Sequence, residues 1–297
     1  MTDERPVVLL PQVPPLGGSY VRGVAAGGRL AVERRLGRAG ASLPALAYEV
    51  AGVRPDAEHL TAYQHHVGES GSDRLPAGFV HVLAFPLATA LMVRADFPLP
   101  LVGMVHLANR VEQHAPTTLV EALDLHAHAE NLAPHRSGTA VDLVTEARVD
   151  DRLVWRGVST YLAKGVRLAG RPADDEPRPS FVPPVPTGRW HLDAGTGRRY
   201  AQVSGDRNPI HLSALGAKAF GFPRTIAHGM DTAARTLAAV GPARGDAFVW
   251  TVQFAAPVLL PSSPSVRVAR DGDGFGVDVW HARSGKLHLT GRVDPLR

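Results

Sequence analysis

The sequence predicts an α+β protein in which an antiparallel sheet wraps around a buried helix, and in which this unit occurs twice. The first observation is the length of 297 residues, about two domains at roughly 150 residues each. The second is a proline-rich stretch, residues 171–186, that divides the chain into two parts. The third is the order of elements, because each part contains one long apolar helical segment followed by several strand-like segments.

The proline-rich stretch is expected to be a linker between two domains, residues 1–170 and residues 187–297. It holds six prolines and the acidic run Asp174-Asp175-Glu176. Proline lacks the backbone N–H that a sheet requires and stiffens the chain. The stretch therefore favours an extended connection over a strand.

A weak internal repeat connects the two parts. The segments that begin at Val141 and Val277 both resemble hairpins, and their offset is 277 − 141 = 136. Residues 63–69 (YQHHVGE) resemble residues 200–206 (YAQVSGD), at an offset of 206 − 69 = 137. Two separate resemblances at nearly the same spacing predict a duplicated unit.

In the second part, the segment Gly229–Val240 (GMDTAARTLAAV) is predicted to be a buried helix, because it is rich in alanine and apolar on most sides. Gly241-Pro242 then supplies a helix stop. Strands are predicted after it, over Phe248–Phe254 and over residues 265–269, 275–280 and 286–293.

In the first part, residues 79–93 are the equivalent buried helix, with Pro86 expected to kink it or to delay its start. The predicted strands are residues 104–111, 119–129, 139–149 and 153–162. Residues 123–129 (LDLHAHA) alternate apolar and polar side chains, which is the period of a half-buried strand. His126 and His128 share one face there; metal chelation is an alternative, but a solvated strand face is the simpler interpretation.

Composition excludes several classes of site and partner. The chain has no cysteine, which excludes a disulfide scaffold, a thiolate zinc site, an iron–sulfur cluster and a cysteine nucleophile. Its net charge of +4 comes from scattered arginines without a basic run, which argues against nucleic acid as a partner. An anionic small molecule remains compatible with this charge.

The chain is expected to be a soluble cytoplasmic protein without a targeting signal. Its first residues, MTDER, are acidic where a signal peptide needs positive charge. The longest apolar stretch, residues 79–93, contains His81 and Pro86 and is shorter than a membrane span. We therefore expect no membrane partner.

The segment with the clearest chemistry is residues 200–230, YAQVSGDRNPIHLSALGAKAFGFPRTIAHGM. Gly205 permits a tight backbone, and Pro209 disfavours a helical conformation at Asn208, the residue before it. Residues 206–210 are therefore expected to form a rigid, non-helical loop.

This loop is expected to aim Asp206 and His211 at one water molecule as a general acid–base pair, while Asn208 hydrogen-bonds nearby groups to hold its shape. Gly229 opens the buried helix, and its amide is a candidate donor to a developing oxyanion. Structural alternatives exist, because Asx-type turns explain many such polar residues and helix packing explains the glycine almost as well. His228 is expected to order the helix start or to pack rather than to act in catalysis.

These residues resemble the signature of a known enzyme family. The pattern Y-x-x-x-S-G-D-x-N-P-I-H at residues 200–211, followed by I-A-H-G-M at residues 226–230, is similar to that of the MaoC-like, (R)-specific enoyl-thioester hydratases. Residues 75–93 and 102–116 resemble, more loosely, the non-catalytic half of double-hotdog (R)-3-hydroxyacyl-thioester dehydratases. The resemblance implies the double hotdog fold, in which two antiparallel sheets each wrap a central helix as a pseudo-dimer in one chain.

The resemblance also implies an activity: reversible syn hydration of a trans-2-enoyl thioester, or dehydration of an (R)-3-hydroxyacyl thioester, in fatty-acid or related lipid metabolism. Carried over to this chain, Asp206 and His211 activate the water and shuttle the proton. Asn208 supports the loop, and the amide of Gly229 polarises the thioester carbonyl. The resemblance implies no cofactor and no metal, and a substrate carried on coenzyme A or on acyl carrier protein.

The carrier, the acyl chain and the assembly stay open at this point. Four basic residues near the motif could meet the phosphates of the carrier, although surface charge explains each as well: Arg207, Lys218, Arg224 and Arg235. A homodimer of pseudo-dimers is compatible with the resemblance, but nothing in the sequence requires it.

The first part is expected to be non-catalytic and to shape the acyl pocket. At the repeat offset, the positions of Asn208, Pro209 and His211 hold residues without their chemistry: Gly71, Ser72 and Arg74. Two alternatives to a hydratase are kept, a hotdog thioesterase, because one fold hosts many activities, and a non-catalytic acyl-thioester-binding subunit.

Overall fold

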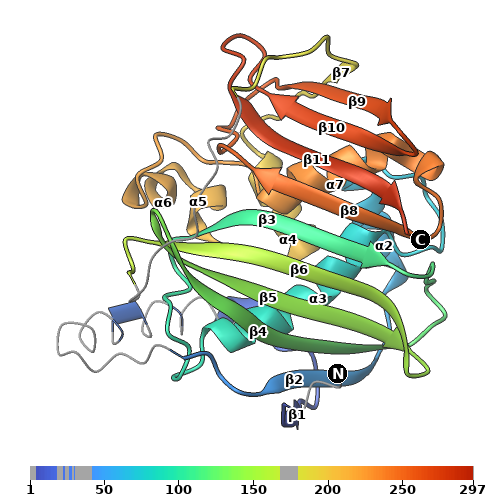
Figure 1. The fold of residues 1–297 in the computed structure, drawn as a ribbon, viewed down its shortest axis with the longest axis vertical. Helices are drawn as coiled ribbons and strands as arrows, with labels where there is room; N and C mark the ends of the chain where they lie inside the picture. Colours follow the sequence, from blue (N-terminus) through green and yellow to red (C-terminus); the bar gives the residue numbers. More distant parts are fainter. Residues whose placement is uncertain are drawn as a thin grey trace.

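The computed structural model describes residues 5–18, 23, 27–28, 30, 42–167 and 180–296. Their strands form an eleven-stranded sheet in the order β1-β2-β4-β5-β6-β3-β8-β11-β10-β9-β7. Figure 1 shows the strands of the first part in its lower half, those of the second part in its upper half, and the long helices behind the sheet. This arrangement agrees with the predicted α+β class and with one sheet-and-helix unit in each part.

The first part contributes one side of the sheet and the helices α2 (Ala57–Val67) and α3 (Ala77–Met92). Its strands are β1 (Val7–Leu9), β2 (Ala47–Val53), β3 (Met104–Gln113), β4 (Leu123–His135), β5 (Gly138–Val149) and β6 (Arg152–Lys164). Neighbouring strands are antiparallel except β1 and β2, which are parallel. A turn joins β5 to β6, between the two strands predicted at residues 139–149 and 153–162, with positive φ at Asp150 and Asp151.

Helix α3 is buried because its sequence, AGFVHVLAFPLATALM, is apolar on almost every side. The sheet curves around it, so that α3 packs against β2, β4, β5 and β6. Pro86 lies inside the helix, and the helix begins at Ala77. A delayed start at this proline was therefore the wrong alternative, because burial of the first turn outweighs the one backbone hydrogen bond that the proline removes.

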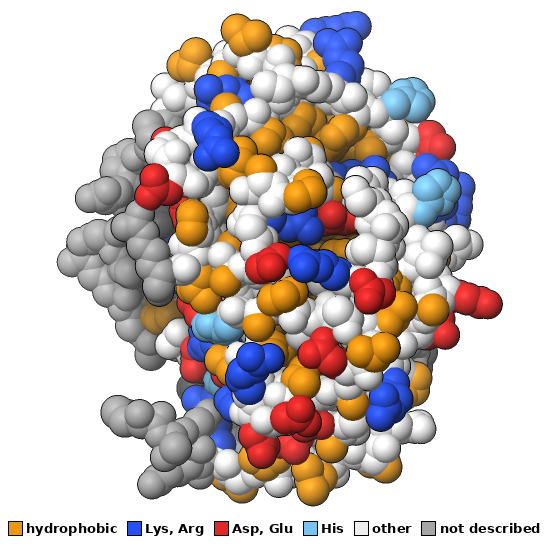
Figure 2. Space-filling view, turned by 90° about the vertical axis from the view of Figure 1, so that its right-hand side faces the viewer, with side chains coloured by type: hydrophobic (Ala, Val, Ile, Leu, Met, Phe, Trp, Pro, Cys, Tyr) orange, Lys and Arg blue, Asp and Glu red, His pale blue; other side chains and the backbone are white. Residues whose placement is uncertain are grey.

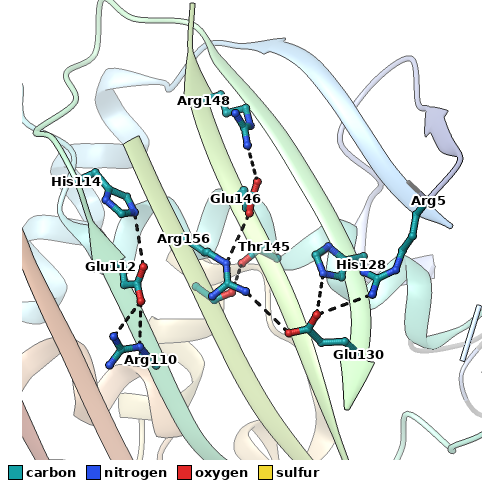
Figure 3. A network of polar contacts seen from close by, with 11 residues as sticks. Arg5, Arg110, Glu112, His114, His128, Glu130, Thr145, Glu146, Arg148 and Arg156 are labelled. Atoms are coloured by element: carbon teal, nitrogen blue, oxygen red, sulfur yellow. Dashed lines mark hydrogen bonds and ion pairs between the residues drawn. The ribbon is translucent and has the colours of Figure 1, made fainter. Parts of the chain in front are cut away.

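Polar side chains of β3 to β6 form a network on the outer face of the sheet (Figure 3). Glu130 Oε2 lies 3.3 Å from His128 Nε2, and Arg156 lies 3.9 Å from Glu130 and 3.6 Å from Glu146. His128 is only 7% exposed, so the predicted solvated face is wrong for this residue. Long charged neighbours such as Arg156 can cover a side chain on a strand face that faces water.

The second part supplies the other side of the sheet and a series of helices. Its strands are β7 (Gly188–Arg189), β8 (Phe248–Phe254), β9 (Ser265–Asp271), β10 (Gly274–Trp280) and β11 (Leu287–Pro295). Its helices are α4 (Thr196–Ser204), α5 (Pro209–Leu212), α6 (Ala214–Ala219), α7 (Gly229–Val240) and the 3₁₀ turn η1 (Gly241–Arg244). The predicted bounds of α7 and β8 are confirmed to the residue, and Gly241 ends α7 with a φ of 65°.

The two parts join through an antiparallel ladder and a shared core. Residues 108–113 of β3 pair with residues 248–253 of β8, which makes the sheet continuous across the join. Arg244 of the second part lies 3.1 Å from Glu69 of the first, and one cluster of buried apolar side chains includes residues of both parts. Of the predicted linker, residues 171–179 lie outside the described residues, and residues 180–186 form neither helix nor strand.

Figure 2 shows one face of the molecule, on which basic and acidic side chains alternate without a large patch of one sign. This face therefore has no extended basic surface of the kind that binds nucleic acid. Among the helices that the structure describes, none combines the length and the apolar character needed to cross a bilayer.

Candidate active site

A cavity of about 500 Å³ lies where the two parts meet. Its walls come from α3, β3 and β6 of the first part, and from residues 200–230 and the end of β8 in the second. All four site residues predicted from the sequence line it: Asp206, Asn208, His211 and Gly229. The size is that of a small-molecule site.

The loop that carries Asp206 is held by short-range hydrogen bonds. Gly205, with a φ of 71°, ends α4 in the left-handed conformation that favours glycine. The amide of Asp206 donates to Ser204 Oγ at 3.2 Å, and the amide of Asn208 donates to Asp206 Oδ1 at 3.1 Å. These bonds fix the direction of the Asp206 carboxylate, which is 21% exposed toward the cavity.

The expected non-helical loop over residues 206–210 is only partly correct. Asn208 is extended, with φ −57° and ψ 126°, as the following proline requires. Pro209 and Ile210, however, begin the one-turn helix α5. Asn208 Oδ1 accepts from the amide of Ile210 at 3.4 Å, and proline is favoured at the first position of a helix, so this Asn-Pro pair starts a helix rather than extending the loop.

Helix α5 places His211 with one ring nitrogen fixed. Nδ1 lies 2.9 Å from the carbonyl oxygen of Ile226, which can only accept, so Nδ1 carries the proton and Nε2 keeps its lone pair. Burial, and after it the proximity of His228, lower the pKa of His211 to about 3, although the Asp206 carboxylate acts in the opposite direction. His211 is therefore neutral near pH 7 and has one basic nitrogen available.

His228 contributes more than the sequence indicated. Its ring stacks on that of His211 with centroids 3.6 Å apart, and its Nε2 donates to the carbonyl oxygen of Asp206 at 3.0 Å. It occupies the N-cap position of α7 but makes no side-chain capping bond there, so the expected role in ordering the helix start is not supported. It connects the Asp206 loop, α5 and α7, and nothing in the local pattern distinguishes it from an ordinary packing residue.

The ligand atoms of Asp206, His211 and His228 all lie within 4.8 Å of one another. In the described part of the chain, they form the one cluster of three or more side chains with metal-ligand geometry, so the alternative of a metal at His126 and His128 gains no third ligand. Two of the nitrogens in this cluster already hydrogen-bond to carbonyl oxygens. The arrangement offers one carboxylate and one bare imidazole nitrogen to a small polar molecule.

Gly229 is the first residue of α7, so its amide has no acceptor within the helix. The positive end of the helix dipole coincides with this amide, which favours a partial negative charge beside it. A Cβ at this position would lie 3.1 Å from the Phe254 ring, so close packing also explains the glycine. Both interpretations of Gly229 that the sequence offered remain consistent with the geometry.

Comparison with known proteins agrees with these observations. A model of the MaoC like domain family matches residues 178–288. The 3-hydroxyacyl-thioester dehydratase X of Mycobacterium tuberculosis is 36% identical over 242 residues, which span 81% of this chain and 86% of that protein.

The chain belongs to the MaoC-like 3-hydroxyacyl-thioester dehydratase family. The crystal structure of HtdX from Mycobacterium tuberculosis is similar to this structure, with a TM-score of 0.76 at 34% identity. The match covers 84% of this chain and 100% of the HtdX chain. A further M. tuberculosis protein, described as a double hotdog, is similar in fold at a TM-score of 0.50 and 16% identity, over 82% of this chain and 93% of that one. The predicted family, double hotdog fold and hydro-lyase class are confirmed.

The first part of this MaoC-like chain also brings polar side chains to the cavity, which sequence reasoning missed. His81 of α3, His106 of β3 and Tyr161 of β6 all line it. Burial lowers the pKa of His81 to about 4 and that of His106 to about 3. No local motif marks these residues, because they reach the site through the pairing of β3 with β8.

Of the basic residues suggested for a carrier phosphate, Arg235 is already engaged within this MaoC-like chain. Its Nε lies 2.8 Å from the buried carboxylate of Asp231, which also meets His66 at 3.1 Å. Arg207, Lys218 and Arg224 are exposed but do not line the cavity. Lys164 and Arg136 of the first part do line it.

Proposed function

We propose that this chain catalyses the reversible syn hydration of a trans-2-enoyl thioester, and the dehydration of the (R)-3-hydroxyacyl thioester, with Asp206 and His211 as the catalytic pair. The observation that carries the proposal is the convergence, in one cavity of a MaoC-like chain, of a fixed carboxylate, a neutral imidazole with one bare nitrogen and a helix-terminal amide. General acid–base partners of this kind supply about 10²–10⁴-fold in rate.

In the hydration direction, a water molecule lies between Asp206 and His211. Nε2 of His211 removes one proton while the oxygen forms a bond to C3, and the Asp206 carboxylate stabilises the imidazolium that results. The proton then passes to C2 on the same face, so one water supplies both the hydroxyl group and the hydrogen. His228 stacks on His211 and binds the Asp206 carbonyl, and it acts as a positioning residue for both.

The amide of Gly229 donates a hydrogen bond to the thioester oxygen and stabilises the negative charge that develops on it. Because this charge is larger in the enolate-like transition state than in the substrate, a donor fixed at the helix terminus accelerates the reaction. Asn208 acts indirectly, since its side chain starts α5 and thereby places His211. No step of this scheme needs a metal or an organic cofactor.

The scheme assigns different roles to the two parts of the chain. Residues 1–170 form a non-catalytic hotdog that shapes the acyl pocket, residues 171–186 connect it, and residues 187–297 form the catalytic hotdog. The substrate is an acyl thioester of coenzyme A or of acyl carrier protein. Lys164 and Arg136, at the cavity wall, are better placed for the phosphates of either carrier than Arg235.

The test is an assay of the purified chain with trans-2-enoyl-CoA substrates of increasing chain length. We expect loss of the enoyl-thioester absorbance and formation of the (R)-3-hydroxyacyl product, without release of free thiol. Release of thiol would identify a thioesterase instead, and binding without turnover would identify a non-catalytic acyl-thioester-binding subunit. Parallel assays with the same acyl groups on acyl carrier protein distinguish the two carriers.

A further inference from the structure

We propose that His81, His106 and Tyr161, all from the first part of the chain, form a polar subsite that binds a hydroxyl group on the acyl chain, beyond the reacting C2–C3 bond. The inference deepens the proposed function and rests on it, because it names the class of acyl group. A site for an unsubstituted alkyl chain would be lined by apolar side chains at these positions.

His81 is a buried imidazole without a partner. It is 7% exposed and lines the cavity, and neither ring nitrogen has a hydrogen-bond partner within the described residues. Its one ring contact is with Phe85, one helical turn further along α3, at 5.8 Å between centroids. Buried polar groups in native proteins almost always have a partner, so a group that faces a cavity and lacks one indicates a ligand or a bound water.

His106 presents an acceptor in a defined direction. Its Nε2 is buried and has no partner within the described residues. The backbone of Ala108 hydrogen-bonds to the ring. Because Nε2 has no partner, this bond involves Nδ1, which therefore carries the proton. The register of β3 against β6 shifts between His106 and Ala108, which marks a β-bulge. Bulges beside sites re-aim side chains, and here the bulge lies just where β3 leaves its ladder with β8.

Tyr161 completes the subsite. It faces His106 across the β3–β6 ladder, and the two rings stack with centroids 4.5 Å apart. Burial raises the pKa of the Tyr161 phenol, which therefore remains protonated and can donate a hydrogen bond. The subsite thus combines a bare nitrogen, which needs a donor, with groups that can donate to an oxygen.

A hydroxyl group is the oxygen function that matches both requirements, because it donates and accepts at once. A ketone only accepts and would leave His106 Nε2 unpaired, and an alkyl chain would leave both histidines unpaired, whereas Tyr161 also has Ser159 as a side-chain hydrogen-bond partner. Phe254 gives the position along the acyl chain. Its ring lies 4.8 Å from that of His106, and a Cβ added to Gly229 would lie 3.1 Å from it, so Phe254 separates the subsite from the amide proposed to bind the thioester carbonyl. We therefore place the hydroxyl group at C4 to C6.

The experiment compares trans-2-octenoyl-CoA with its analogues that carry a hydroxyl or an oxo group at C4, C5 or C6. For the unmodified chain, we expect kcat/KM for the best hydroxylated substrate to exceed that for octenoyl-CoA and for the matching oxo analogue by about tenfold or more. His106→Phe should reduce this ratio to about one, because turnover of the hydroxylated substrate falls more than turnover of octenoyl-CoA. His81→Leu provides a second, independent variant in case the first fails to fold.

The matched control is Met92→Leu, which changes an apolar wall of the same cavity at nearly constant volume and should leave the ratio unchanged. Equal kcat/KM for the hydroxylated and plain substrates overturns the proposal, since the groups then hold only water. An equal loss for both substrates in His106→Phe also overturns it and places these residues on the carrier arm. Turnover of none of the substrates would instead contradict the proposed function itself.

Discussion

Helix α2 of the first part and helix α4 of the second part end in nearly the same conformation, but the segments that follow them differ. Gly68 and Gly205 both end their helices with a positive φ, of 81° and 71°, and their separation, 205 − 68 = 137, equals the repeat offset. After Gly205 follow the Asp206 turn and α5. After Gly68 follows Glu69, which is paired with Arg244 at 3.1 Å, so that the carboxylate is already neutralised.

The starts of the two central helices differ in a related way. Gly229 begins α7 at the cavity, where its amide is accessible to a ligand. At Gly78, near the start of α3, an added Cβ would overlap the hydroxyl group of Tyr63. Tyr63 is itself buried, at 1% exposure, and its hydroxyl group lies against the first turn of α3. One unit thus keeps an open helix terminus and the other closes it with a side chain.

The difference teaches that similar helix ends can have different surroundings. In the first part, the Glu69–Arg244 ion pair and Tyr63 occupy the positions that correspond to the Asp206 carboxylate and the open end of α7 in the second. The contribution of the first part to the cavity comes from α3, β3 and β6. The first two predictions below set a residue of the second part against its counterpart in the first.

The largest effect is expected at the catalytic pair. Asp206→Asn and His211→Ala should each reduce kcat for enoyl-CoA hydration by about 10²–10⁴-fold, because each removes a general acid–base partner. The matched control is Glu69→Gln, at the repeat position of Asp206, which should retain kcat. Steady-state kinetics with circular dichroism to verify folding would measure this, and comparable losses in all three variants would remove the distinction between the parts.

A smaller effect is expected at the two glycines. Gly229→Ala keeps the amide but presses on Phe254, so a shift of α7 should lower kcat by about tenfold or more. Gly78→Ala should leave kcat unchanged and lower the free energy of unfolding by about 1–3 kcal/mol, through overlap with Tyr63. Denaturant unfolding and kinetics on both variants test the pair, and a stability loss without a kinetic effect in Gly229→Ala would support packing as its sole role.

The third prediction concerns pH and stability. His81, His106 and His211 have pKa values of about 4, 3 and 3 in the folded chain, below the ordinary value of 6.5. The unfolded chain therefore binds more protons below pH 6.5, and the free energy of unfolding should fall as the pH decreases from 6.5 toward 4. The slope is at most about 1.4 kcal/mol per pH unit for each histidine.

His106→Phe should make this slope shallower, as measured by urea unfolding at several pH values. An unchanged slope in His106→Phe would mean that this ring is protonated in the folded state.

The smallest effect is expected from metal removal. The carbonyl bonds at His211 Nδ1 and His228 Nε2 leave the other nitrogen of each ring and the Asp206 carboxylate as possible ligand atoms, but the proposed scheme uses Asp206 and His211 to bind and activate water and needs no ion. Incubation with EDTA should leave kcat/KM unchanged. A loss of activity that zinc restores would replace the acid–base scheme with metal-assisted hydration.

The parts of the fold that depend on local pattern could be predicted from the sequence. Gly229–Val240 and Phe248–Phe254 have the predicted bounds, because alanine-rich periodicity and a glycine stop define the first and a β-rich run the second. Helices α2 and α4 were missed, although signals were present at α2. Asp56 caps its start by accepting from the amide of His59 at 2.8 Å, and Gly68 ends it.

The site could be predicted only where its residues are close in sequence. Asp206, Asn208, His211 and Gly229 lie within one motif, and all of them reach the cavity. The ring of His228 looked like packing, because its role depends on the fold of the loop 22 residues before it. The opposite wall depends on strand pairing across more than 130 positions, which no local pattern encodes.

The ladder between β3 and β8 has a consequence for how such a catalytic unit can exist alone. Without β3, β8 would present a row of unpaired amides and carbonyls, which is an open template for another strand. We expect residues 187–297, expressed alone, to aggregate or to pair β8 with β8 of a second copy. Such a pair would have two identical sites, whereas the cavity described above has walls from two different parts of the chain.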